Sequence, residues 1–269
     1  ELGMSQVAVS YAIRGLEQQL GVALFERQHR AARLTEVGER FHADVSAGLS
    51  RIGRAAEDIR SKGREVNVTL AASTAFASMW MLPRLTALRE DLPDIDLRIQ
   101  TSVRDLDLEE EAIPLGVRGG KAEDWPHYHS ALLAPEVITA VASPAFVEAH
   151  GMPETPEALT RHPLIWLEEP VRQACSWPAW FASAGIDYKP ASRRLAINDY
   201  VLVIQAVLAG QGIALGWTHL VRQLVAQGQL VEVGGHALRT ELAFHVVWPR
   251  SRELSGAATR VRNWLLDQA

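Results

Sequence analysis

The sequence contains only one cysteine, Cys175, among 269 residues. A single cysteine forms no internal disulfide, and this usage fits the reducing cytoplasm. We interpret Cys175 as a small buried apolar residue rather than a redox sensor, because no second cysteine is present to resolve an oxidised thiol. No apolar run approaches the roughly eighteen residues that span a bilayer, so we expect no membrane partner.

The usual signatures of enzymes are also missing. The nine histidines show no metal-ligand spacing, and His127-x-His129 is interpreted as part of a surface loop. There is no Gly-x-Ser-x-Gly elbow and no glycine-rich phosphate loop with lysine. The run Glu109-Glu110-Glu111 is interpreted as a solvated acidic surface, since sequence neighbours do not face each other. We therefore predict no catalytic residue, no metal site and no cofactor.

The sequence does not have a strong excess of charge of either sign. It carries 27 basic and 32 acidic residues, a net charge of −5, which excludes a protein that is basic throughout. Any nucleic-acid binding must therefore be local. The length is sufficient for two or three domains, and 48% hydrophobic with 22% charged residues describes a soluble globular protein.

An amphipathic helix is predicted between Ser5, a potential N-cap, and Gly21, a potential stop. Its apolar residues recur at steps of four, three and four, which predicts one buried face; they are Val9, Ile13, Leu16 and Leu20. The opposite face carries groups that hydrogen-bond base edges and phosphates, so it fits a major groove, with an ordinary surface helix as the alternative. The residues expected to contact DNA from this helix are Ser5, Gln6, Val7, Ser10, Tyr11 and Arg14.

A short hairpin with a basic tip is predicted directly after this helix. Leu24–Arg27 and Ala32–Thr35 flank a turn, and Arg27, Arg30 and Arg33 lie near its tip. These arginines, together with Thr35, are expected to hold the phosphate backbone. The order of helix, glycine and basic hairpin favours DNA binding over a mere run of surface charge.

This region resembles the winged helix-turn-helix of LysR-type transcriptional regulators. The resemblance rests on Ser5-Gln6-x-Ala8-Val9-Ser10, Leu20-Gly21-Val22, Leu24-Phe25-Glu26-Arg27 and Leu34-Thr35-Glu36. In that family one helix and most of a second precede this point, so Glu1–Met4 resembles the tail of the second helix. The resemblance implies that the sequence begins inside its DNA-binding domain and that effector binding is its best-preserved function.

A long helix is predicted from Glu36 to about Arg60. Its apolar and small residues keep a strict seven-residue repeat: Leu34, Gly38, Phe41, Val45, Gly48, Ile52, Ala55 and Ile59. Such a seam needs a partner helix, so we predict a homodimer; packing on its own domain is the alternative. The resemblance implies an antiparallel pair of linker helices that sets half-site spacing, and pairing of dimers into a tetramer.

Beyond residue 65, alternating strands and helices predict an α/β body with a largely parallel sheet. Strands are expected near 66–72, 95–101, 115–118, 137–142, 163–167, 195–197, 213–216 and 241–248. Ligands of such sheets bind beyond the carboxyl ends of the strands. The expected effector contacts are Ser73, Thr74, Ala75, Phe76, Thr101, Ser102, Arg118, Gly119, Leu167, Asn198 and Asp199. Trp80, Trp125 and Trp217 fall near the predicted cleft edges, although most tryptophans are interpreted as core residues.

This body also resembles the LysR family. Met81-Leu82-Pro83-Arg84-Leu85 is similar to its effector domains, and Asp124-Trp125-Pro126 to the subgroup containing the glycine-cleavage activator and the β-lactamase-operon regulators. The resemblance implies two Rossmann-like lobes of periplasmic-binding-protein type, with the inducer between them. The subgroup often has an acidic residue and a tyrosine near Pro114 and Gly119, so one inducer contact is expected to differ here.

We therefore predict four parts. They are a partial winged helix-turn-helix at residues 1–35, a linker and dimerisation helix at 36–60, a hinge at 61–65 and an effector-binding domain at 66–269, with lobe I at 66–138 and 245–269 and lobe II at 139–244. The predicted function is a cytoplasmic, oligomeric transcriptional regulator that binds duplex DNA under control of a small-molecule effector. The alternative is a solute-binding protein without a DNA function, because its two lobes would have the same fold.

Overall fold

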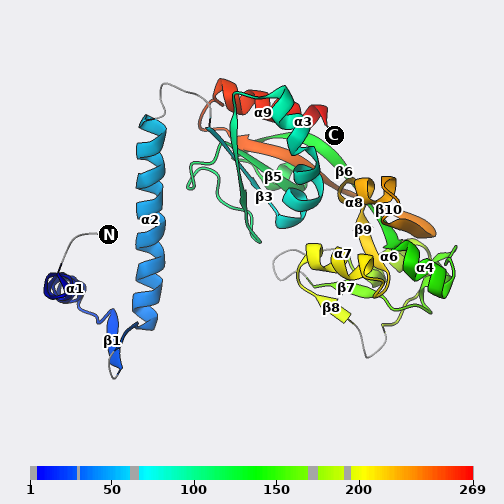
Figure 1. The fold of residues 1–269 in the computed structure, drawn as a ribbon, viewed down its shortest axis with the longest axis horizontal. Coiled ribbons are helices and arrows are strands. Elements are labelled where there is room, and N and C mark those ends of the chain that lie inside the picture. The colour runs from blue at the N-terminus through cyan, green and yellow to red at the C-terminus, as the bar shows by residue number, and fades with distance from the viewer. Residues whose placement is uncertain (1–4, 29–30, 61–66, 169–174, 191–194, 269) are drawn as a thin grey trace. The chain divides into compact units, whose positions relative to one another are not determined.

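The computed structural model describes residues 5–28, 31–60, 67–168, 175–190 and 195–268. The chain divides into two compact units, Glu1–Gly63 and Arg64–Ala269, which are described separately (Figure 1). The predicted hinge at 61–65 lies outside the described residues. No described helix is long and apolar enough to cross a membrane.

Helix α1 of the first unit spans Gln6–Leu20. Ser5 caps it by accepting a hydrogen bond from the Ala8 N–H at 3.3 Å, and Gly21 ends it with a φ of 70°. The face predicted to be buried remains partly open, since Val9 and Leu20 are 39% and 43% exposed. Within the described residues of this unit, no element covers that face completely.

The hairpin consists of β1, Phe25–Gln28, and β2, Ala31–Leu34, paired antiparallel. Glu17 of α1 holds its first strand, because Oε1 accepts hydrogen bonds from the N–H groups of Leu24 at 2.8 Å and Phe25 at 3.0 Å. This carboxylate joins α1 to the hairpin through charge-assisted hydrogen bonds.

Helix α2 spans Glu36–Arg60, as the heptad pattern predicts. Thr35 connects it to the hairpin: its hydroxyl accepts from the Gly38 N–H at 3.0 Å and donates to the Ala23 carbonyl at 2.9 Å. Gly38 packs against Leu24 of the same chain rather than facing a partner, and a Cβ added there would lie 2.0 Å from the Leu24 carbonyl oxygen. Further along the seam, Val45 and Ile52 remain exposed.

The second unit is built on one mixed six-stranded sheet. Its order is β4 (Asp96–Thr101), β3 (Asn67–Ala72), β5 (Leu115–Gly120), β10 (Val231–Pro249), β6 (Tyr128–Ala142) and β9 (Ala214–Trp217). Only β3 with β4 and β3 with β5 are parallel pairs; the other three pairs are antiparallel. The prediction of a largely parallel sheet is therefore wrong.

The cause of this difference is the length of β6 and β10. They have 15 and 19 residues, run side by side through both lobes, and pair antiparallel over most of their length (Figure 1). The sequence predicts only 137–142 and 241–248, because the hydrophobic alternation breaks where the strands pass between the lobes. Register shifts interrupt the ladder at Val233/Ala237, Arg239/Ala243 and Phe244/His245.

Lobe I comprises β3, β4, β5 and the adjoining ends of β6 and β10, with α3 (Leu85–Asp91) and α9 (Gly256–Asp267). The helical segment after β3 is irregular: it begins as a π-helix at Phe76–Met81, continues as a 3-10 turn at Leu82–Arg84, and ends in α3. Pro83 has no N–H to donate, which accounts for an interruption of regular helical hydrogen bonding there.

Lobe II contains the other ends of β6 and β10, β9, and a small parallel pair, β7 (Ile165–Leu167) with β8 (Leu195–Ile197). Its helices are α4 (Pro144–His150), α5 (Pro156–Leu159), α6 (Trp177–Ser183), α7 (Tyr200–Leu208) and α8 (Thr218–Ala226). The core of this lobe is aromatic. Trp177 and Trp180 are buried and donate hydrogen bonds to the Ile165 and Ile138 carbonyls.

Candidate functional site

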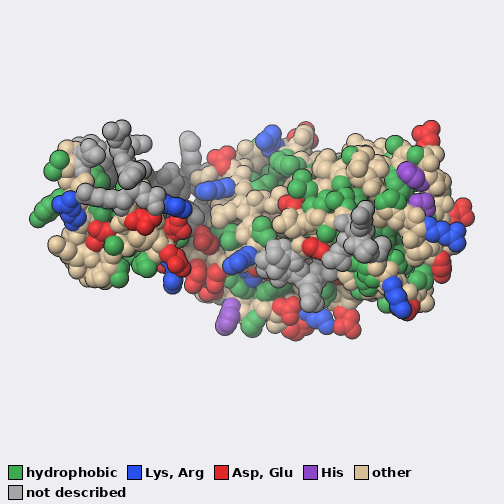
Figure 2. Space-filling model, turned by 90° about the horizontal axis from the view of Figure 1, so that it is seen from below, with side chains coloured by type: hydrophobic (Ala, Val, Ile, Leu, Met, Phe, Trp, Pro, Cys, Tyr) green, Lys and Arg blue, Asp and Glu red, His purple; other side chains and the backbone are tan. Residues whose placement is uncertain are grey.

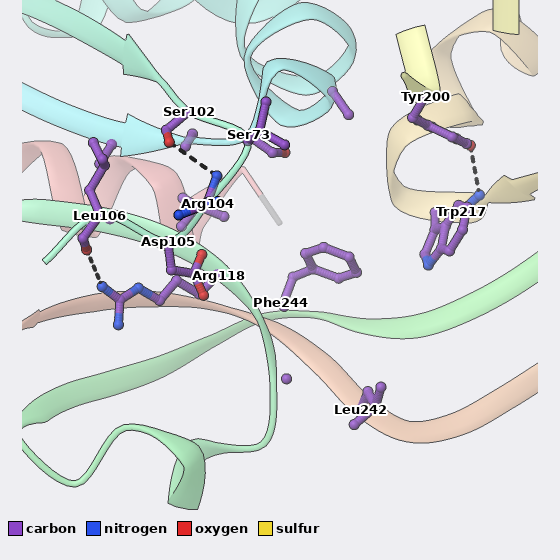
Figure 3. A pocket seen from close by; sticks show the side chains of 18 of the residues that line it. Ser73, Ser102, Arg104, Asp105, Leu106, Arg118, Tyr200, Trp217, Leu242 and Phe244 are labelled. Atoms are coloured by element: carbon purple, nitrogen blue, oxygen red, sulfur yellow. Dashed lines mark hydrogen bonds between the residues drawn. The ribbon is translucent and has the colours of Figure 1, made fainter. Parts of the chain in front are cut away.

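A cavity of about 340 Å³ lies where the two lobes of the second unit meet. Its wall includes the ends of β3, β4 and β5 from lobe I, the crossing parts of β6 and β10, and Tyr200 and Trp217 from lobe II. Figure 3 shows Ser73, Ser102 and Arg104 on one side, Tyr200 and Trp217 on the other, and Phe244 between them. The volume is within the usual range for small-molecule sites.

The cavity brings together six of the eleven expected effector contacts. These six residues are Ser73, Ala75, Ser102, Arg118, Gly119 and Leu167. They lie at strand ends or within three residues beyond them, as expected for an α/β sheet.

The other five are absent from the described cavity wall: Thr74, Phe76, Thr101, Asn198 and Asp199. Phe76 is buried and stacks on Trp80, with ring centroids 4.8 Å apart. Asp199 caps α7 by accepting from the Leu202 N–H at 3.1 Å. Thr101 precedes Ser102 on the same strand end, where successive side chains alternate between faces, so only one of the two faces the cavity.

Sequence reasoning missed several residues of the wall, notably Arg104, Glu136, Tyr200 and Phe244. Glu136 and Phe244 come from the crossing parts of β6 and β10, and the prediction placed Glu136 outside any strand. Of the three tryptophans near the predicted cleft edges, Trp217 lines the cavity. The signal that could have found Glu136 is its isolation, as one acidic residue between the apolar runs 131–135 and 137–142.

Arg118 organises one wall of the cavity rather than pointing freely into it. Its side chain is buried, it donates a hydrogen bond to the Leu106 carbonyl at 2.5 Å, and its guanidinium lies 4.5 Å from the centre of the Tyr128 ring. The Tyr128 hydroxyl in turn accepts from the Leu108 N–H at 3.2 Å and donates to Asp107 at 3.1 Å. Together these contacts fix the segment 106–108.

Gly119, one of the two departures from the subgroup, has a structural role. A Cβ added at Gly119 would lie 3.1 Å from Cε1 of Phe244, so the absence of a side chain leaves room for that ring. The aromatic surface near this point therefore comes from β10 instead of β5.

Glu136 connects β6 to lobe II. Its Oε1 accepts a hydrogen bond from the Trp217 indole N–H at 2.9 Å, and its Oε2 accepts from the Thr240 hydroxyl at 2.6 Å. Trp217 also donates its backbone N–H to the Tyr200 hydroxyl at 3.1 Å, and the two rings meet edge to face at 5.0 Å. Burial first, and the Glu136 charge second, raise the pKa of the nearby Cys175 thiol to about 12, so this thiol is a poor nucleophile at neutral pH.

His219 packs against the Phe244 ring in a tilted arrangement, with ring centroids 4.0 Å apart. Neither ring nitrogen has a hydrogen-bond partner among the described residues. Burial lowers the pKa of His219 to about 4, because a charged imidazolium is poorly solvated there.

We expect His219 to make stability fall in mild acid. Its folded-state pKa of about 4 lies below the ordinary 6.5, so the unfolded chain takes up a proton first as the pH drops through 6.5. This one group should lower the free energy of unfolding by about 2 kcal/mol at pH 5 relative to pH 7. Urea titrations of the wild type and His219→Leu at both pH values measure the effect as the difference in their pH dependence. An identical loss in both proteins would contradict it.

The expected DNA-contacting face of α1 is open. Val7 and Tyr11 are 78% and 81% exposed, and Ser10 and Arg14 are also exposed. Arg33 is exposed on β2, whereas the side chains of Gln6 and Arg27, and the whole of Arg30, lie outside the description. Thr35 uses its hydroxyl twice within the chain, so it positions the hairpin. On the face drawn in Figure 2, acidic and basic side chains are interspersed, in keeping with the small net charge.

Two sequence families match the chain. Residues 1–39 match the family described as "Bacterial regulatory helix-turn-helix protein, lysR family", and residues 61–269 match "LysR substrate binding domain". The Glycine cleavage system transcriptional activator of Escherichia coli K12 is 28% identical over 269 residues, covering 100% of this chain and 87% of that protein. The HTH-type transcriptional activator AmpR of Pseudomonas aeruginosa is 28% identical over 274 residues, covering 100% and 88%.

Solved structures have the same fold. The effector domain of AmpR of Pseudomonas aeruginosa aligns with a TM-score of 0.62 and 24% identity, covering 76% of this chain and 95% of that chain. Full-length AphB of Vibrio cholerae aligns with a TM-score of 0.55 and 22% identity, covering 99% and 91%. Among the described residues, no group of three or more histidine, cysteine or acidic side chains is arranged to hold a metal ion.

Proposed function

Because this chain belongs to the LysR family of transcriptional regulators, we propose that it binds operator DNA through α1 and its hairpin, under control of a small effector held in the cavity between the lobes. The bases are contacted by Gln6, Val7, Ser10, Tyr11 and Arg14, and the phosphates by Ser5, Arg27, Arg30, Arg33 and the backbone around Thr35. The relatives that match it are transcriptional regulators, so a solute-binding protein without a DNA function is set aside.

The position of the cavity is the observation that carries this proposal. Its wall draws on both lobes and on the crossing parts of β6 and β10, the strands that join them. An effector bound there contacts both lobes at once, and it favours the relative orientation in which all those contacts are made. A change in lobe orientation alters how paired subunits present α1 to DNA.

The proposal includes a dimer formed through α2. The exposed seam residues Val45 and Ile52, 39% and 67% exposed, support pairing with a second copy of the helix. Two recognition helices then contact two half-sites, and two such dimers form a tetramer on longer operators. We assign the protein to the cytoplasm, where DNA is accessible and the single cysteine stays reduced.

Selection from random duplexes tests the DNA function. The chain should enrich a sequence with two related half-sites, and its affinity should fall steeply with salt because arginines displace counterions from phosphate. Arg14→Ala should weaken binding roughly tenfold and relax sequence preference, as expected for a base contact worth about 1–3 kcal/mol. The matched control is Arg161→Ala, an exposed arginine of lobe II, which should leave binding unchanged. Failure to enrich any sequence would refute the proposal.

A further inference from the structure

Glu136 lies at the centre of an aromatic part of the cavity wall. In the register of the sheet, Ala134 of β6 pairs with Phe244 of β10, and Ile138 of β6 pairs with Trp217 of β9. Glu136 is two residues from each of these positions on β6, so its side chain lies on the same face as both rings. The Trp217 indole, bonded to Oε1 at 2.9 Å, lies directly beside the carboxylate.

Within the described residues, this carboxylate accepts hydrogen bonds from neutral donors. Trp217 and Thr240 each donate one hydrogen bond, and no lysine or arginine from the described part of the chain bonds to it. Each carboxylate oxygen can accept more than one hydrogen bond, so both oxygens can accept a further hydrogen bond from a ligand in the cavity. A carboxylate that neutral donors hold in a partly buried wall favours a ligand that supplies a positive charge.

The other charges of the cavity do not compensate for Glu136. Among the described residues of its wall are two arginines, Arg104 and Arg118, and three carboxylates, those of Asp105, Asp124 and Glu136. Arg118 is directed to the Leu106 carbonyl and the Tyr128 ring. Arg104 belongs to the opposite side of the cavity from Trp217 (Figure 3). On the Trp217 side of the cavity, the described residues therefore provide the hydrogen-bond acceptors and negative charge of Glu136, together with aromatic rings.

We propose that this subsite binds the protonated primary amine of the effector. The inference rests on the proposed effector function and names the chemical class that this function requires. A primary ammonium has three N–H donors, so it forms a charge-assisted hydrogen bond with Glu136 while the rings of Trp217 and Phe244 stabilise its charge. A quaternary ammonium has no N–H to donate and fits less well. A hydroxyl in place of the amine forms the hydrogen bond without the charge.

The test compares amines with matched alcohols on the full chain. The probes are the L-amino acids and the linear mono- and diamines of two to six carbons, each beside the compound in which a hydroxyl replaces the amine. Binding is followed by the thermal midpoint of unfolding and by tryptophan fluorescence, since Trp217 lies in the site. At least one amine should raise the midpoint and change the fluorescence, and its alcohol should bind roughly tenfold more weakly or worse.

Three variants separate the role of Glu136 from general effects. Glu136→Gln should weaken amine binding by roughly tenfold or more, with the alcohol affected much less. Phe244→Leu keeps the carboxylate but removes a ring, so it should weaken binding of the same amine by a few-fold. This variant still tests the subsite if Glu136→Gln does not fold. Glu148→Gln is the matched control: it makes the same change at an exposed glutamate of α4 that is not part of the described cavity wall, and it should leave amine affinity within about twofold.

The outcomes distinguish this inference from the proposed function. Binding of acids or alcohols but of no amine, or equal amine affinity in Glu136→Gln and the wild type, would overturn the amine subsite while leaving an effector cavity in place. If no probe binds, the amine inference is also overturned. Loss of sequence-specific DNA binding, measured separately, would instead overturn the regulator function.

Discussion

Replacing Gly38 with alanine is expected to separate the hairpin from α2 and to abolish operator binding. The added Cβ would lie 2.0 Å from the Leu24 carbonyl oxygen and 2.9 Å from its carbonyl carbon, both of them backbone atoms. A backbone cannot rotate away as a side chain does, so the junction must open. We expect a cost of about 3 kcal/mol or more. The Thr35 hydrogen bonds would be lost with it.

Gly53 provides the matched control in the same helix. An alanine Cβ at Gly53 meets nothing within 4 Å, so Gly53→Ala should stabilise α2 by up to about 1 kcal/mol. Amide hydrogen exchange of Leu24 and Phe25, with anisotropy measurements on a selected duplex, reports both effects. Gly38→Ala should lose protection at these amides and roughly a hundredfold or more in affinity. Retained protection and affinity would show that the contact at Gly38 is not required.

Replacing Arg118 with alanine is expected to remove about 3–4 kcal/mol from the stability of the second unit. The change deletes a large buried side chain, leaves the Leu106 carbonyl without its donor, and removes the cation from the Tyr128 ring. The segment 106–108 would then lose its attachment to β5. Effector affinity should fall as well, although Arg118 acts here by positioning the wall rather than by contacting the ligand.

Arg104→Ala is the comparison, because Arg104 lines the same cavity with an exposed side chain. Its effect on unfolding should stay within about 0.5 kcal/mol. Urea unfolding followed by tryptophan fluorescence compares the two variants. Equal stability losses would refute the positioning role of Arg118, whereas a ligand defect confined to Arg104→Ala would identify that residue as the direct contact.

Local patterns allowed the prediction of much of the fold. The hydrophobic repeat places α2 at its observed bounds, and Ser5 with Gly21 marks both ends of α1. Strands β3, β4, β5, β8 and β9 also fall close to the expected positions. These elements are determined by neighbouring residues, through periodicity, caps and turns.

The rest depends on contacts between residues distant in sequence. Pro135 and Glu136 interrupt the apolar alternation of β6, so a window of neighbouring residues gives no reason to continue the strand to Tyr128. Only pairing with β10, about one hundred residues later, keeps it extended. The same limit explains why only part of the cavity wall was predicted. Ser73 and Ser102 follow from the ends of single strands, whereas Glu136, Tyr200 and Phe244 come together only when β6 and β10 pair.

The pairing of Ala142 with Val231 has an evolutionary consequence. The chain between these two residues forms most of lobe II, including β9 at the edge of the sheet, and returns to a position beside its start, so most of lobe II is a single insertion with adjacent ends. Insertions of this kind are exchanged or altered without breaking the host domain. Tyr200 and Trp217 belong to this insertion, whereas Glu136 and Phe244 belong to β6 and β10, outside it. A gene exchange limited to residues 143–230 would thus replace one wall of the cavity in a single step, so the same DNA-binding unit would respond to a different effector.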